Sequence, residues 1–198
     1  MIFSFSRRQP LPPKLIRGFS LIEILLVIGL IMLLAIAGFV MFERSSTSRK
    51  VNQEITNLAA IEAGIKTVFP LLNGNYSTLP TSGLTLLFNQ ARIIPSNMNG
   101  GNYTTGDNIT HSWGGAVTMH VTNASHGGVG IGKGVSINYV DVPSEGCVGL
   151  VSKGIQRFAA IQVVYARSAD VVASNYTMDN IVNLCSSAET GSLRFVLN

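Results

Sequence analysis

The sequence predicts a protein of the α+β class, with one long N-terminal helix packed on a mainly antiparallel sheet of four strands. An uncharged run of 19 residues, Ile24 to Phe42, is followed by apolar residues at helical spacing as far as Phe69. Four later segments are rich in β-forming residues. Two cysteines, Cys147 and Cys185, lie in the same C-terminal half of the chain.

The composition excludes a disordered protein and gives no sign of a nucleic-acid partner. Hydrophobic residues make up 46% of the 198 residues and charged residues only 12%, about half the usual share. The net charge of +4 comes from four bases that precede the first acid; they are Arg7, Arg8, Lys14 and Arg17. The rest of the chain carries ten bases and ten acids, so no basic patch for phosphates is expected.

The uncharged run is long enough to cross a membrane. As a helix, 19 residues span roughly 28 Å, the thickness of a hydrocarbon core. Because the bases precede it, we expect the N-terminus in the cytoplasm and the rest exported across the inner membrane. A cleaved secretory signal, with Ala35-Ile36-Ala37 as its cleavage site, is the alternative. The length of the run and the carboxylate of Glu23 at its entrance favour a retained span.

The helix is expected to continue beyond Phe42 and to become amphipathic. Apolar residues recur three, four or seven positions apart, at Val51, Ile55, Leu58, Ile65 and Phe69. Polar residues lie between them, at Asn52, Glu54, Asn57 and Lys66. Since Pro70 stops a helix, the pattern predicts one helix of about 50 residues whose second half buries one stripe.

The remaining elements are predicted from capping residues and β-forming runs. The four expected strands are Ala116–Val121, Val135–Val142, Phe158–Tyr165 and Ser192–Leu197. Short helices are expected at Ser144 to about Ile155 and at Thr177 to Ser186. Residues 75–112 are interpreted as a surface loop with one short helix around Leu84 to Ala91, ended by Pro95.

The two cysteines lie on the exported side, where an oxidising periplasm favours a disulfide. A bridge between Cys147 and Cys185, 38 residues apart, would stabilise the fold by about 4 kcal/mol on the chain-entropy model. Two unpaired thiols are the alternative. Zinc binding is disfavoured because there is no Cys-x-x-Cys pair and no adjacent histidine set.

A short motif precedes the apolar run. The residues Arg17-Gly18-Phe19-Ser20-Leu21-Ile22-Glu23 resemble the processing site of type IV prepilins. The resemblance implies that a prepilin peptidase cuts between Gly18 and Phe19 and N-methylates the new Phe19 amine. Residues 1–18 would then be the leader, residues 19–43 the membrane and polymerisation half of the helix, and residues 44–198 the head.

The same resemblance gives Glu23 a role in filament assembly. Cleavage creates a charged amine at Phe19, and the Glu23 carboxylate can pair with the amine of a neighbouring subunit. A lone charge is expensive in an apolar bundle, whereas a satisfied pair is tolerable. We therefore expect this pair to guide docking and axial register.

Further residues resemble the type IVb pilins of toxin-coregulated and conjugative thin pili. The segments Asn57-Leu58, Gly74-Asn75-Tyr76 and Val182-Asn183-Leu184-Cys185 carry this likeness. Two features depart from it: Phe19 is commonest in type IVa pilins, and an 18-residue leader is intermediate between the two types. The implied fold is that of a type IV pilin.

The resemblance implies a major pilin that polymerises with copies of itself into an extracellular fimbrium for adhesion, aggregation or conjugation. The implied partners are prepilin peptidase, a platform protein, an assembly ATPase and a secretin. One alternative is a pseudopilin of a type II secretion system. The other is a monomeric, membrane-anchored binding domain.

Three further sequence patterns predict no functional site. Gly127 to Lys133 has the spacing of a phosphate loop, but Gly134 replaces the magnesium-binding Ser or Thr, so a glycine turn is expected. The histidines 111, 120 and 126 have no supporting carboxylates, so we expect them to be exposed and without metal. Five Asn-x-Ser/Thr sequons are interpreted as polar loops; they begin at Asn75, Asn102, Asn108, Asn123 and Asn175. No catalytic motif is present, so we predict no enzyme and no cofactor.

Overall fold

A computed structural model describes residues 20–198 except 70–73, 107 and 173. The chain divides into two compact units, one ending at Phe42 and the other beginning at Glu43. A single helix, α1 (Leu21–Val68), contributes its first half to one unit and its second half to the other. The units are therefore described separately.

Helix α1 has ends that match its sequence. The backbone N–H groups of Glu23 and Ile24 donate to the Ser20 carbonyl oxygen at 2.9 and 3.2 Å. Glu23 lies in the first turn and Lys66 in the last, the placements that the helix dipole favours. The predicted helix of about 50 residues is confirmed at 48 residues.

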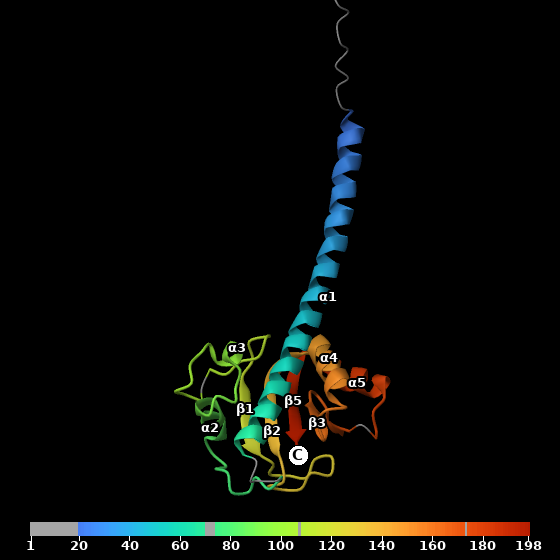
Figure 1. The fold of residues 1–198 in the computed structure, drawn as a ribbon. Helices are drawn as coiled ribbons and strands as arrows, with labels where there is room; N and C mark the ends of the chain where they lie inside the picture. Colours follow the sequence, from blue (N-terminus) through green and yellow to red (C-terminus); the bar gives the residue numbers. More distant parts are fainter. Residues whose placement is uncertain (1–19, 70–73, 107, 173) are drawn as a thin grey trace, which may run out of the picture. The chain divides into compact units, whose positions relative to one another are not determined.

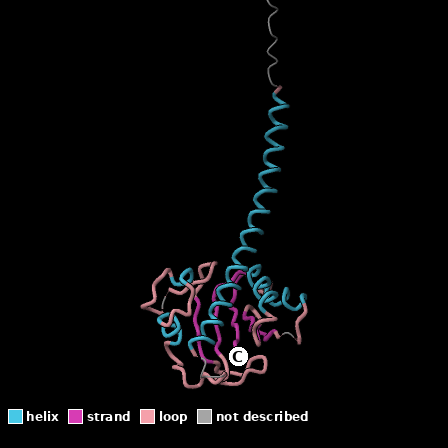
Figure 2. The backbone as a smooth tube through the Cα atoms, viewed as in Figure 1, coloured by secondary structure: helices cyan, strands magenta, loops and turns pink. Residues whose placement is uncertain are grey.

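The second unit is built on one sheet of five antiparallel strands (Figures 1 and 2). The strands are β1 (Val117–Val121), β2 (Val135–Pro143), β3 (Ala160–Val164), β4 (Ser168–Val171) and β5 (Thr190–Leu197). Their order across the sheet is β1-β2-β5-β3-β4. The α+β class is confirmed, but the predicted count of four strands is one too low. The missed strand is β4, four residues at the sheet edge.

The second half of α1 lies across one face of this sheet (Figure 1). Val51, Leu58 and Ile65 are buried as predicted, whereas Ile55 and Phe69 are only half-buried. They join inward-facing strand residues in one core; its largest members from the sheet include Met119, Ile137, Tyr139 and Phe195. The amphipathic stripe is thus covered by the sheet.

Four short helices flank the sheet: α2 (Leu84–Gln90), α3 (Ser96–Asn99), α4 (Ser144–Gly154) and α5 (Met178–Cys185). Helices α2, α4 and α5 match the prediction, and the Thr177 side chain caps α5 by accepting from the Asn180 N–H. Helix α3 was not predicted. It begins directly after Pro95, which is its N-cap residue. The segment 75–112 is also more than a surface loop, since Leu84, Phe88, Ile94 and Met98 are buried in the core.

Candidate functional site

The first unit presents an unpartnered apolar helix surface. Leu21–Gly38 is long and apolar enough to cross a membrane, and none of it is buried within the described chain. The exposed large side chains lie on every side of the helix because they occupy nearly consecutive positions. An all-round apolar helix is stable only in lipid or among other apolar helices. This surface is therefore the first candidate site.

The predicted processing residues stand at the start of this helix. Glu23 is exposed in the first turn of α1. Gly18 and Phe19 lie outside the described residues. Cleavage at Gly18-Phe19, N-methylation of Phe19 and the pairing of Glu23 therefore remain predictions.

A second glutamate of α1, Glu54, is buried at 1% exposure. The Tyr139 hydroxyl donates to its Oε2 at 2.9 Å, and the Ser112 backbone N–H donates to its Oε1 at 2.8 Å. The Ser112 hydroxyl and the Asn57 amide donate as well. The sequence pattern placed Glu54 and Asn57 outside the buried stripe, but both side chains are buried. The spacing contained the signal: Glu54 lies three residues after Val51 and four before Leu58, which is the buried face.

The surroundings of Glu54 shift the titration of its neighbours. Burial raises the pKa of Tyr139 well above its usual value, and the nearby Glu54 carboxylate raises it further. The His111 ring stacks on Tyr139 with centroids 5.2 Å apart, and burial lowers the pKa of His111. The cluster therefore favours a neutral phenol and a neutral imidazole around one carboxylate. It joins α1 to the sheet.

The cysteines form the disulfide that the sequence predicts. Cys147 in α4 and Cys185 at the end of α5 are bonded, with their Cα atoms 5.7 Å apart, and both are fully buried. The bridge ties α4, which contacts β2 and β5, to α5, which contacts β4. The two cysteines are 38 positions apart, and the segment between them carries β3 and β4.

The prediction that the three histidines are exposed is wrong for two of them. His120 is exposed, but His111 and His126 are buried at 3% and 7% exposure. Each buried ring has local hydrogen-bond partners, His111 at the Val140 carbonyl oxygen and His126 at the Asp170 carboxylate. No group of three or more potential metal ligands occurs among the described residues.

The glycine-rich segment is a connection between strands, as predicted. It joins β1 to β2, and a strand rather than a helix follows it at Val135. Gly127, Gly128 and Gly132 have positive φ angles of 56°, 88° and 71°, which suits tight turns. Without a following helix N-terminus it lacks the geometry of a phosphate loop.

The fold and the family agree on what kind of protein this is. The chain belongs to the PilS family, because the family model described as PilS N terminal matches residues 48–198. It is a type IVb-like pilin, which confirms the resemblance seen in the sequence. Pilins are structural subunits, so the chain is not an enzyme. The matched range begins after the motif around Gly18.

Solved structures with the same fold are pilins. The type IV pilin TcpA from Vibrio cholerae El Tor is 14% identical, with a TM-score of 0.50 over 76% of this chain and 99% of that one. A type IVb pilin from Salmonella typhi is 19% identical, with a TM-score of 0.50 over 72% and 98%. At these identities the likeness shows the fold. The comparison with curated proteins finds no match.

Proposed function

We propose that this chain is the major subunit of a type IVb-like pilus and polymerises through the first half of α1. One observation carries the proposal: the apolar surface of Leu21–Gly38 is unburied on all sides of the described helix. Lipid covers such a surface before assembly, and the same half of other copies covers it in a filament. The family and the fold support this role.

Maturation supplies the assembly-competent N-terminus in this proposal. Prepilin peptidase removes residues 1–18 at the cytoplasmic face of the inner membrane and N-methylates Phe19. The helical half within residues 19–43 stays in the membrane with its N-terminus inside, and the head, residues 44–198, faces outward. A platform protein, an ATPase and a secretin then extract and export the growing filament, which serves adhesion, aggregation or conjugation.

Glu23 makes the axial contact of the filament in this proposal. Its carboxylate lies one helical turn from the Phe19 amine that cleavage creates. In the incoming subunit that carboxylate meets the amine of a subunit already in place, and the two charges cancel as the helix leaves lipid. The helix dipole also favours a carboxylate in the first turn.

The first experiment is the intact mass of the protein recovered from cell envelopes, with and without reductant. The proposal expects a chain that starts at N-methylated Phe19 and gains two hydrogens on reduction. A chain that still starts at Met1, or that starts at Gly38 after a secretory-type cut, would overturn the pilin pathway. The result then favours a plainly anchored or secreted domain.

The second experiment compares Glu23→Ala with Glu189→Ala, a change of the same kind at an exposed position of the head. Both chains should be processed and inserted normally. For Glu23→Ala alone, the yield of sheared filaments is expected to fall at least about tenfold. A tenfold loss corresponds to about 1.4 kcal/mol less favourable assembly. Wild-type yield would refute the Glu23 role, and short periplasmic polymers without surface filaments would favour a pseudopilin.

A further inference from the structure

The two edges of the sheet differ in how their backbone groups are covered. At the β1 edge the Met119 N–H donates to the Thr85 hydroxyl at 2.9 Å, and the Val117 N–H donates to the Ile109 carbonyl oxygen at 2.8 Å. Neighbouring segments therefore seal that edge against other strands. The β4 edge instead borders an open cleft of about 360 Å³.

The cleft lies between β4 and α5, and its lining is mixed. Ala169 and Val171 of β4 and Leu184 of α5 give it apolar surface. The polar lining residues are Arg167, Asp170, Asn175, Asn180 and Asn183. A volume near the lower end of the usual range suits one small ligand.

The polar side chains from α5 converge on the cleft because of helical spacing. Asn180, Asn183 and Leu184 are three and four residues apart and so share one helix face, while Ile181 and Cys185 turn into the core. The disulfide from Cys185 to Cys147 holds that helix in place. Within the described chain the side chains of Arg167, Asn180 and Asn183 form no hydrogen bond to protein, so their donors and acceptors face outward.

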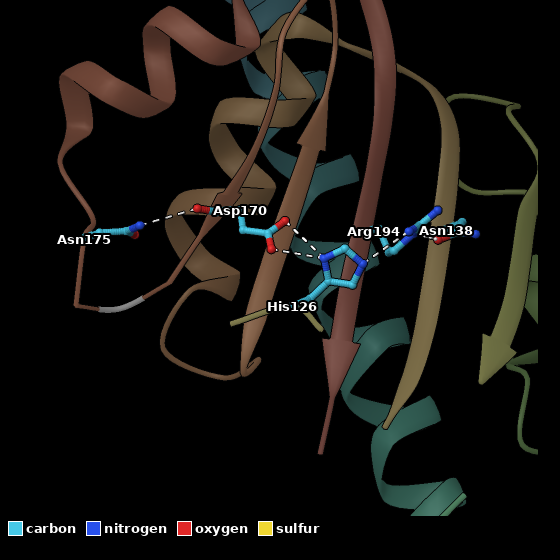
Figure 3. A network of polar contacts seen from close by, with 5 residues as sticks. All are labelled: His126, Asn138, Asp170, Asn175 and Arg194. Carbon is cyan, nitrogen blue, oxygen red and sulfur yellow. Dashed lines mark hydrogen bonds and ion pairs between the residues drawn. The ribbon is translucent and has the colours of Figure 1, made fainter. Parts of the chain in front are cut away.

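The opposite wall, β4, is braced from the outer face of the sheet. Figure 3 shows the Asp170 carboxylate against the His126 ring, with Nδ1 of His126 3.0 Å from Oδ2 of Asp170. His126 in turn lies beside Arg194, whose Nε donates to Asn138 Oδ1 at 2.9 Å. The short edge strand is thus tied to β5 and β2 by side chains as well as by its ladder with β3.

The cleft is closed to an added strand. Asn175 donates through Nδ2 to the Asp170 carbonyl oxygen at 3.4 Å (Figure 3). Its Oδ1 accepts from the Val172 N–H at 2.8 Å. Since that carbonyl points away from β3, it is one of the groups that an incoming strand would need. A compact ligand avoids this competition, whereas an extended peptide does not.

We propose that this cleft binds a neutral sugar residue. The carboxamides of Asn180 and Asn183 and the guanidinium of Arg167 offer donors and acceptors to several hydroxyl groups, and the apolar surface of Ala169 and Leu184 suits the C–H face of a sugar ring. Arg167 and Asp170 carry opposite formal charges, so the residues around the cleft have no net formal charge. This inference concerns the head alone and does not rest on polymerisation.

The test uses the full-length protein in lauryldimethylamine oxide, a detergent without a sugar headgroup. The probes are the methyl glycosides of glucose, galactose, mannose and N-acetylglucosamine, with saturation-transfer NMR for binding and ¹⁵N shifts for location. At least one glycoside is expected to bind saturably in the millimolar range and to shift the amides of β4 and α5. Absence of saturable binding by all four, or shifts confined to another surface, would overturn the proposal.

Matched variants test the lining residues. Arg167→Gln and the double change of Asn180 and Asn183 to Ala should each weaken binding at least about tenfold, the share expected for lost polar contacts. Asn123→Ala, an exposed asparagine outside the lining, should bind as the wild type does. Unchanged affinity in the lining variants contradicts the proposal. The proposal is also contradicted if an alternating Thr-Val pentapeptide shifts the β4 amides and no glycoside does. That result would show that the cleft binds an extended peptide.

Discussion

Glu23 in the first half of α1 and Glu54 in the second half have opposite surroundings. Glu23 is exposed in the first turn, within a helix surface that nothing in the described chain covers. Glu54 is buried and accepts hydrogen bonds from Tyr139, Ser112 and Asn57. One carboxylate is satisfied inside its own head, whereas the other is the one for which we propose a partner in a neighbouring subunit. We therefore propose that the same helix serves folding with one half and association with the other.

The apolar side chains show the same division. In the first half they project on all sides, with Leu21 77% and Leu33 68% exposed. In the second half only one stripe is apolar, and the sheet covers it. Burial against its own domain requires an amphipathic helix, whereas burial among copies allows an apolar surface all round. The difference predicts that substitutions in the two halves have separable effects.

The largest expected effect comes from Glu54→Ala. The change leaves the Tyr139 hydroxyl and the Ser112 N–H buried without their acceptor, which should lower the free energy of unfolding by about 3 kcal/mol. Urea unfolding of the full-length protein in detergent measures it. The same assay on Glu23→Ala should give the wild-type midpoint. Equal midpoints for the two variants would contradict the prediction that substitutions in the two halves have separable effects.

A smaller effect is expected when a methyl group is added to the helix glycines. A Cβ at Gly64 would lie 2.9 Å from Cγ2 of Ile93, whereas at Gly29 it would meet nothing within 4 Å. The clash outweighs the better helix propensity of alanine, so Gly64→Ala should destabilise the head by about 1 kcal/mol. Gly29→Ala should leave head unfolding unchanged. A higher unfolding midpoint for Gly64→Ala would contradict the close packing of α1 against Ile93.

The smallest effect is the pH dependence of the Glu54 cluster. Burial lowers the pKa of His111, so the unfolded chain takes up a proton near pH 6.5 while the folded chain does not. Stability should therefore fall as the pH drops below about 6.5 and level off below the folded pKa. Urea midpoints from pH 7.5 downward measure this slope. His111→Phe, which keeps a ring on Tyr139, should flatten it.

Another group of α1, the Glu62 carboxylate, titrates in a pH range separate from that of His111. Burial raises the pKa of Glu62, but hydrogen bonds from Lys66 and Arg157 outweigh it and hold the pKa below its usual value. Its contribution is present above about pH 4.5 and is lost as the pH falls through the folded pKa. A slope between pH 7 and 5 that persists in His111→Phe would contradict the assignment to His111.

Local pattern was enough for the longest elements. The charge-free run, the stripe from Val51 to Ile65 and the β-forming runs follow from residue order alone, because helix and strand periods are written in the sequence. Strand β4 was not predicted because the sequence Ser168-Ala-Asp-Val has little β propensity. It is a strand because β3 pairs with it along four residues.

The sequence by itself determined the α+β class, the membrane-length apolar helix and the pilin resemblance, and it favoured a disulfide between the two cysteines. These follow from composition, period and motif, which are local properties. Only the tertiary structure decided that Glu54, His111 and His126 are buried, and that β4 and α5 enclose a cleft. A polar side chain enters a core when distant segments supply its hydrogen bonds, as Ser112 and Tyr139 do for Glu54. No local window of the sequence contains those partners.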